Sequence, residues 1–233
     1  MALPQLNSAR YETTIPSLGK TISYRPYLVK EEKILMLALE SQDQKMIMRA
    51  IKDVIELCTF DDINVNKLAV FDIECLFLAL RSKSVGENMD LKIKCSECEG
   101  LVDVLINVDE IVPPQVNTDN VVMLTETVGV TLRYPSFEMV SNMGDDIDTV
   151  DGAFKMIADC IDTIFDDDAV HDASNVTEKE MNDFLENLNS DQFKKMSTYF
   201  EDMPALKHDL HYDCPTCNKS NHMELKGLQS FFT

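Results

Sequence analysis

The spacing of apolar residues predicts a β-hairpin followed by three helices in the first third of the chain. Residues 11–29 alternate apolar and polar positions on either side of a turn at Gly19, a pattern typical of paired strands. Residues 30–41 have acidic side chains in their first turn, at Glu31 and Glu32, where the dipole of a helix favours negative charge. Apolar positions then recur at helical spacing in residues 43–58 and about 69–82. We expect these three segments to form a bundle-like helical unit.

A shorter period appears in the segments 89–95, 101–107, 206–212 and 223–225. There, apolar and polar residues alternate, which is the period of a β-strand. The four segments are expected to pair as two β-hairpins, one near the middle of the chain and one near its C-terminal end. A further hairpin or strand pair is expected at residues 121–134.

The central part of the chain is expected to be helical. The pattern predicts a short helix at residues 136–143 and a long one at residues 148–165. Thr177 and Glu180 have the spacing of a capping box, which indicates the start of a third helix. Ser190 is expected to cap a fourth helix.

Acidic residues are concentrated in this central part. Residues 144–186 contain fourteen Asp or Glu residues and two Lys residues. The segment FDDDAVHD (165–172) is similar to a calcium-binding loop only in being acidic, because it lacks the central glycine and the terminal glutamate of such loops. We interpret it as a solvated turn.

Four of the seven cysteines occur in two CxxC pairs, Cys95 with Cys98 and Cys214 with Cys217. Each pair lies in an expected turn between two short strands, an arrangement that directs two thiolates to one side. A tetrahedral zinc site needs four such donors. The 115 residues between the pairs do not forbid their meeting, because the entropy of loop closure grows only logarithmically with length. The spacing therefore favours one structural Zn²⁺ held by all four cysteines.

Three alternatives to a shared zinc site remain open from the sequence. A redox-active CxxC usually begins a helix, whose dipole lowers the pKa of the thiol, and neither pair is expected to do so. The two pairs could also be unrelated. His222 is a rival ligand, but it is expected on a strand and facing solvent, and His171, His208 and His211 are interpreted as surface or edge residues. The remaining cysteines, Cys58, Cys75 and Cys160, are assigned to the core.

Together these patterns predict an α+β fold that is mainly helical, with an N-terminal β-hairpin and a split zinc-ribbon-like pair of β-hairpins. Residues 1–88 are expected to form the N-terminal hairpin and helical unit. Residues 89–134 and 205–233 are expected to form the split module, and residues 135–204 an acidic helical insertion between its halves.

Charge and motifs narrow the classes of function. The net charge of −20 disfavours binding to nucleic acid or to an anionic membrane, because both rely on Lys and Arg. The longest apolar runs are far shorter than the ~20 residues of a membrane span, and the N-terminal residues contain no apolar export signal. Phosphate-binding glycine loops and the HExxH and GxSxG motifs are absent from the sequence. We therefore expect a protein that is not an enzyme.

Four segments are distinctive enough to compare with known families: PSLGKTISYRPYLVKEEKILMLALES (16–41), FDIECLFLALRSKSVGE (71–87), TLRYPS (131–136) and the tail section EKEMNDFLENLNSDQFKKMSTYFEDMPALKHDLHYDCPTCNKSNHMELKGLQSFF (178–232). They resemble the baseplate hub subunit family of T4-type contractile-tailed bacteriophages, the T4 bacteriophage base plate protein family. The resemblance implies a virion or assembly protein of the tail baseplate, made in the host cytoplasm and acting through contacts with other baseplate, hub and tail proteins or further copies of itself. It does not imply the zinc site, which comes from the cysteine spacing alone.

Two main hypotheses follow from this resemblance. The chain is either a structural component of the baseplate hub or an assembly chaperone that leaves the finished particle. A zinc-ribbon nucleic-acid binder is a third option, which the negative charge disfavours. Candidate contact surfaces are YRPYLV (24–29) and the C-terminal GLQSFF, in which Phe231 and Phe232 could serve either as docking anchors or as a cover for the zinc hairpin.

Overall fold

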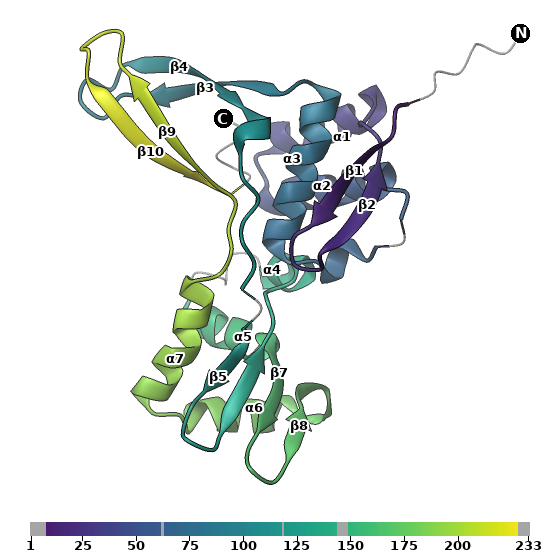
Figure 1. The fold of residues 1–233 in the computed structure, drawn as a ribbon, viewed down its shortest axis with the longest axis vertical. Coiled ribbons are helices and arrows are strands. Elements are labelled where there is room, and N and C mark those ends of the chain that lie inside the picture. Colours follow the sequence, from purple (N-terminus) through teal and green to yellow (C-terminus); the bar gives the residue numbers. More distant parts are fainter. Residues whose placement is uncertain (1–7, 62, 118, 144–148, 228–233) are drawn as a thin grey trace, which may run out of the picture. The chain divides into compact units, whose positions relative to one another are not determined.

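The computed structural model describes residues 8–61, 63–117, 119–143 and 149–227 (Figure 1). The described residues divide into two compact units. Unit 1 is drawn from residues 1–115 and 205–233, and unit 2 from residues 116–204. Helices and small antiparallel sheets occur together, so the fold class is α+β, as predicted. Phe231 and Phe232 lie outside the described residues.

Unit 1 combines a helical part with three β-hairpins (Figure 1). Its helices are α1 (Val29–Ser41), α2 (Gln44–Cys58) and α3 (Val70–Ser84), with short 3-10 turns η1 (Val65–Lys67) and η2 (Val108–Glu110). Its hairpins pair β1 (Tyr11–Ile15) with β2 (Lys20–Tyr24), β3 (Asn88–Lys94) with β4 (Leu101–Asn107), and β9 (Lys207–Asp213) with β10 (Ser220–Lys226). These elements confirm the N-terminal hairpin, the three helices and the two later hairpins expected from the sequence.

Two buried carboxylates fix the N-terminal hairpin to the helices of unit 1. Glu31, at the start of α1, accepts hydrogen bonds from the Arg25 guanidinium (2.9 Å) and from the Leu28 N–H (2.8 Å). Asp72, at the start of α3, accepts hydrogen bonds from the N–H and the hydroxyl of Ser17, at 2.9 and 2.6 Å. Both carboxylate side chains are fully buried, so these bonds replace the water that they would otherwise bind.

The β3–β4 and β9–β10 hairpins share a hydrophobic core with α3. Apolar side chains that alternate along each strand point to the same side and meet there, and they include Leu91 and Ile93 of β3, Leu210 of β9 and Leu225 of β10, with Leu78 of α3. The hydroxyl of Tyr212 donates a hydrogen bond to the Lys94 carbonyl at 3.1 Å and so joins the two hairpins directly. The hairpins are therefore held together by apolar contacts and by this hydrogen bond.

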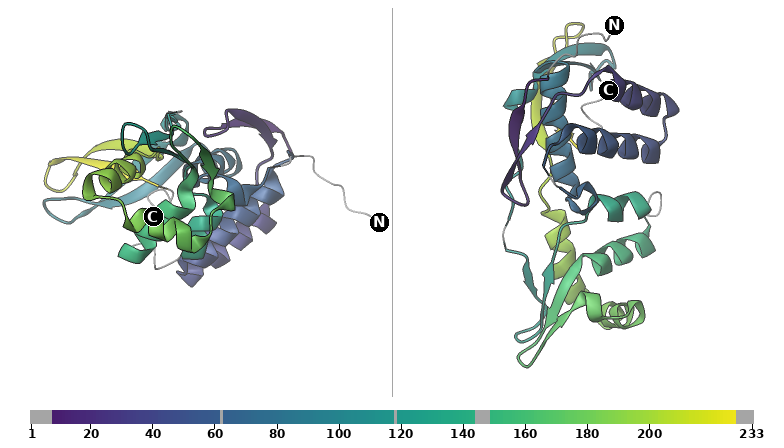
Figure 2. Two further views of the ribbon diagram at one scale, coloured as in Figure 1. Left: turned by 90° about the horizontal axis from the view of Figure 1, so that it is seen from below. Right: turned by 90° about the vertical axis from the view of Figure 1, so that its right-hand side faces the viewer.

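Unit 2 is a small antiparallel sheet with helices packed on one face (Figures 1 and 2). The sheet has the order β5 (Val121–Met123), β6 (Gly129–Leu132), β7 (Ile161–Phe165) and β8 (Val170–Asp172). The helices are α4 (Phe137–Met143), α5 (Val150–Cys160), α6 (Glu178–Glu186) and α7 (Ser190–Glu201), with the 3-10 turn η4 (Ala173–Asn175). Val130 and Leu132, two residues apart on β6, lie in one core with Ile157 of α5, Met181 of α6 and Met196 of α7.

The largest difference from the sequence pattern lies at residues 148–165. Helix α5 ends at Cys160, and Ile161–Phe165 form strand β7, so a single long helix is wrong. The β-branched residues Ile161, Thr163 and Ile164 suit a strand, and Ile161 and Ile164 pair with the buried β6 residues Leu132 and Val130. Tertiary pairing therefore outweighs the helical spacing.

Related differences concern neighbouring segments. Residues 121–134, grouped by their pattern with the cysteine hairpins, supply β5 and β6 of the unit 2 sheet, and the segment 135–204 contains β7 and β8 besides its helices. The predicted solvated turn in FDDDAVHD is the tip of the β7–β8 hairpin, where the Asp166 carboxylate accepts hydrogen bonds from two backbone N–H groups. Helix α6 has its predicted capping box, whereas α7 is capped by Asn189, not by Ser190.

No helix in the described part of the chain combines the length and the apolar character needed to cross a membrane.

Candidate metal centre

The two CxxC loops have the same backbone conformation. In the first, the Cys95 N–H bonds to the Gly100 carbonyl at 2.9 Å, and the Glu99 N–H bonds back to the Cys95 carbonyl at 3.0 Å. The second loop has the equivalent hydrogen bonds, from the Cys214 N–H to the Lys219 carbonyl and from the Asn218 N–H to the Cys214 carbonyl, each at 2.9 Å. The residue after the second cysteine has a positive φ in both loops, 56° at Glu99 and 57° at Asn218, a conformation uncommon for residues other than glycine. Each loop is therefore a tight turn that directs its two sulfurs to one side.

The structure brings all four sulfur atoms together. The Sγ atoms of Cys95 and Cys217 are 3.7 Å apart, those of Cys98 and Cys214 are 3.6 Å apart, and all four lie within 4.8 Å of one another. A tetrahedron of Zn–S bonds of ~2.3 Å has edges of about 3.8 Å. A disulfide would require about 2.05 Å, and the four cysteines are free thiols. The spacing thus matches four ligands around one ion and does not match two disulfides.

Backbone N–H groups favour the thiolate form of one cysteine in each loop. The N–H groups of Cys98 and Glu97 lower the pKa of the Cys95 thiol to about 6, and hydrogen bonds from Cys217 and Asn221 act in the same direction. The backbone N–H of Cys217 likewise lowers the pKa of Cys214.

The opposite shift occurs at Cys217. The Lys219 N–H favours its thiolate, but partial desolvation and the hydrogen bonds with the thiols of Cys98, Cys214 and Cys95 raise its pKa to about 12. Sulfurs this close cannot all carry negative charge unless a cation lies between them.

A buried amide supports the first cysteine loop. Asn221 of β10 is only 5% exposed, and its Oδ1 accepts hydrogen bonds from the N–H and the hydroxyl of Ser96, at 3.2 and 2.7 Å. Its Nδ2 donates to the Lys219 carbonyl at 2.9 Å and contacts Cys95 Sγ at 3.6 Å. Asn221 therefore links a strand of the C-terminal hairpin to the loop that carries Cys95.

The other candidate residues lie apart from the sulfur cluster. His222 faces solvent, as predicted, and its Nε2 is 3.1 Å from Asp209 Oδ1 across the hairpin. Burial raises the pKa of Cys58 to about 11 and the pKa values of Cys75 and Cys160 to about 12, which leaves these thiols unreactive.

The sequence pattern did not single out Asn221 or Ser96 as part of the site. Asn221 has the same strand register as the buried Leu225, so a polar residue occupies a position where alternation predicts an apolar one. This exception to the alternation is the signal in the sequence that could have marked Asn221 as a residue near the cysteines.

Comparison with known proteins assigns the chain to a family. The family model described as T4 bacteriophage base plate protein matches residues 8–233, nearly the whole chain. The chain belongs to the T4 bacteriophage base plate protein family. No curated protein and no solved structure matches it. Membership in this family indicates a structural role in the phage baseplate, in the tail of the virion and in contact with other baseplate proteins, and it confirms the resemblance noted in the sequence.

Proposed function

We propose that the chain is a structural component of the baseplate hub, held in the tail tip by contacts with other hub and tail proteins. The observation that carries this proposal is the family match over residues 8–233. The hub position and a part in tail assembly are finer than the family description, and they rest on the segments of resemblance in the sequence.

An apolar surface on unit 1 supports a role based on protein contacts. Helix α1 buries Leu35 and Ala38, but it also exposes apolar side chains on its other faces. Met36 is 58% exposed and Leu37 is 55% exposed. Val29, at the end of the YRPYLV segment, is 79% exposed. A helix that is apolar on nearly all sides is usually buried, so this surface is suited to contact another subunit.

The test of the structural role is the protein composition of purified phage particles. We expect quantitative mass spectrometry to find the chain in intact tails at a constant ratio to other baseplate proteins. Free baseplates isolated from infected cells serve as the comparison sample. A chain that occurs in assembly intermediates and is lost from finished tails would instead be an assembly chaperone, and the structural proposal would be rejected.

We further propose that Cys95, Cys98, Cys214 and Cys217 bind one structural Zn²⁺. The equal loop conformations, the sulfur–sulfur distances near 3.7 Å and the thiolate-favouring N–H groups support this ion. The β3–β4 and β9–β10 hairpins would then form a split zinc-ribbon-like module. A zinc ion with four thiolate ligands has no open position for water or substrate, so the site would stabilise the fold and would not catalyse a reaction.

Replacing Asn221 with alanine is expected to loosen the metal without unfolding the protein. The substitution removes the hydrogen bonds to Ser96 and the contact with Cys95 Sγ. Loss of such outer partners typically costs 10–100-fold in metal affinity. We therefore expect zinc transfer to a chromogenic chelator to become about 10–100-fold more favourable in Asn221→Ala.

The neighbouring variant His222→Ala is the matched control for this measurement. His222 lies on the same strand but is exposed and bonds to Asp209, so its loss should leave zinc transfer unchanged. More favourable zinc transfer from His222→Ala than from Asn221→Ala would show that the histidine, and not the amide, supports the ion.

A further inference from the structure

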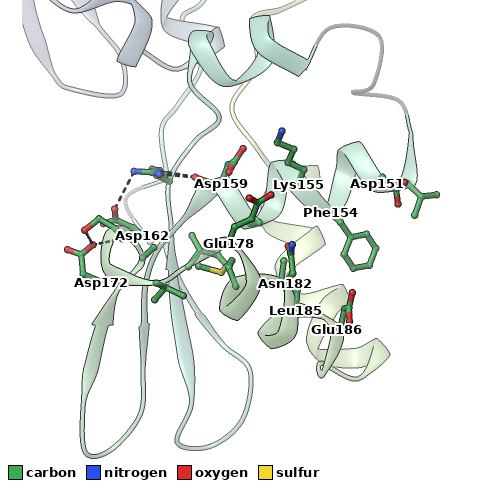
Figure 3. A pocket seen from close by; sticks show the side chains of 18 residues that line it. Asp151, Phe154, Lys155, Asp159, Asp162, Asp172, Glu178, Asn182, Leu185 and Glu186 are labelled. Atoms are coloured by element: carbon green, nitrogen blue, oxygen red, sulfur yellow. Dashed lines mark hydrogen bonds and ion pairs between the residues drawn. The ribbon is translucent and has the colours of Figure 1, made fainter.

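A groove in unit 2 lies between helices α5 and α6. It has a volume of about 1050 Å³, more than most small-molecule pockets need. Figure 3 shows side chains of α5 along one wall and side chains of α6 along the other. Asp162 and Asp172 lie at the end nearest the β7–β8 hairpin, and Asp151 lies at the opposite end. The nine residues of α6 give this wall a length of about 14 Å, which matches two to three turns of a second helix.

The floor of the groove is apolar. Phe154 and Ala158 of α5 line it together with Met181 and Leu185 of α6. A second hollow of about 600 Å³ is lined by Phe154, Leu185, Glu186 and Phe193, among others, so it shares three residues with the first and extends it. Phe154 is 38% exposed although its ring stacks on Phe193 with centroids 4.7 Å apart. An apolar floor of this length can bury the apolar side of an amphipathic segment.

The rim of the groove is acidic. Its carboxylates belong to Asp151, Asp159, Asp162, Asp172, Glu178 and Glu186. Its cations are Arg133 and Lys155, and Arg133 already pairs with Asp162 at 3.7 Å. Among the described residues, no ion pair reaches the carboxylates of Asp159, Glu178 or Glu186. The rim therefore offers negative charge that a cationic ligand can neutralise.

The combination of floor and rim identifies the chemical class of the ligand. Nucleic acid and acidic peptides would be repelled by the rim. A small cation would leave the apolar floor uncovered. We propose that this groove binds a basic amphipathic helix, whose apolar side covers the floor and whose Lys and Arg side chains reach the rim carboxylates. The identification of the helix as part of a neighbouring tail protein rests on the proposed structural role. The preference of the groove for a basic amphipathic helix does not depend on that role.

The direct test measures the binding of a model helix to the purified full-length protein. The probe is a fluorescent peptide of about 14 residues with Leu at helical spacing and Lys at the other positions. One companion peptide has Glu in place of Lys, and the other has Ser in place of Leu. We expect the Leu/Lys peptide to bind in a salt-dependent manner and both companions to bind at least about tenfold more weakly. Equal binding of the Ser/Lys peptide would show simple attraction to an acidic protein and would overturn the proposal.

A pair of charge variants locates the binding. Asp159→Asn with Glu186→Gln removes two rim carboxylates near the C-terminal ends of α5 and α6, where loss of negative charge does not destabilise a helix. The matched control, Asp183→Asn with Glu201→Gln, removes two exposed carboxylates outside the groove, near the C-terminal ends of α6 and α7. We expect the rim variant to weaken binding about five- to tenfold at low salt and the control to change it less than about twofold. Equal effects of the two variants would overturn the groove as the site.

The same two variants, introduced into the phage, test the partner. Reduced incorporation of the rim variant into tails, with normal incorporation of the control, would support a basic helix of a neighbouring tail protein as the ligand. Normal incorporation of both would reject that partner. Absence of the unaltered chain from intact tails would instead reject the structural role and leave the peptide result unaffected.

Discussion

Replacing Cys214 with serine is expected to release the metal and to lower the melting temperature by about 10 °C. A closed site with four thiolates contributes its binding free energy to folding, and Cys214 Sγ belongs to the sulfur cluster, 3.6 Å from Cys98 Sγ. The full value seen in isolated zinc fingers is not expected, because the two hairpins also share an apolar core. A loss of about 3–4 kcal/mol corresponds to about 10 °C in a chain of this size.

The matched control for this prediction is Cys75→Ser. Cys75 is a partly buried thiol of α3 that contacts the same apolar core but lies outside the sulfur cluster. Elemental analysis should find one zinc per chain in the unaltered protein and in Cys75→Ser, and much less than one in Cys214→Ser. Full metal content together with unchanged melting of Cys214→Ser would contradict the zinc site.

Replacing Glu31 with alanine is expected to destabilise unit 1 by about 3–5 kcal/mol, a typical cost of breaking a buried ion pair by removing one partner. The Glu31 side chain is fully buried, and that of Arg25 is 15% exposed. Without Glu31, the Arg25 guanidinium and the Leu28 N–H both lose an acceptor. Urea unfolding followed by circular dichroism measures the change. Glu32→Ala, one residue along the same helix, is the control and should cost less than about 1 kcal/mol, because no hydrogen bond or ion pair of the described residues ends on its carboxylate.

The same ion pair predicts how stability depends on pH. Burial acts against ionisation of Glu31, but the hydrogen bonds from Arg25 and the Leu28 N–H outweigh it and lower its pKa from the ordinary value of 4.5. A carboxylate with a lowered pKa in the folded state stabilises the fold above its unfolded pKa, and this contribution is lost as the pH falls through the folded pKa. Between pH 6 and pH 3 the unaltered protein should therefore lose more stability than Glu31→Ala. Parallel pH profiles of the two proteins would show that Glu31 does not stabilise the fold through its charge.

Local patterns were sufficient for most of the elements and for the four cysteines whose sulfurs converge. Helices α1–α3 and the three hairpins of unit 1 follow the apolar spacing, because each has a single buried side or a tight turn that the pattern records. The CxxC spacing also indicated which sulfurs converge, since a turn between two strands can direct two thiolates to one side whatever the rest of the fold. The residues that support the sulfurs were harder to predict. Asn221 meets Ser96, 125 residues away, and no local pattern records such a contact.

The segment after Cys160 shows what only the tertiary structure decided. Its apolar spacing suits a helix as well as a strand. It forms a strand because it pairs with β6, which presents the buried residues Val130 and Leu132. The groove between α5 and α6 also depends on the tertiary structure. Its acidic rim combines carboxylates from several elements, and no single segment of the sequence determines how those elements pack. By itself, the sequence determined the α+β class, the positions of most helices and hairpins and the four cysteines whose sulfurs meet, since these depend on neighbours along the chain. The sheet of unit 2, the buried Glu31–Arg25 pair, the amide behind Cys95 and the groove depend on contacts between distant residues, and those exist only once the chain has folded.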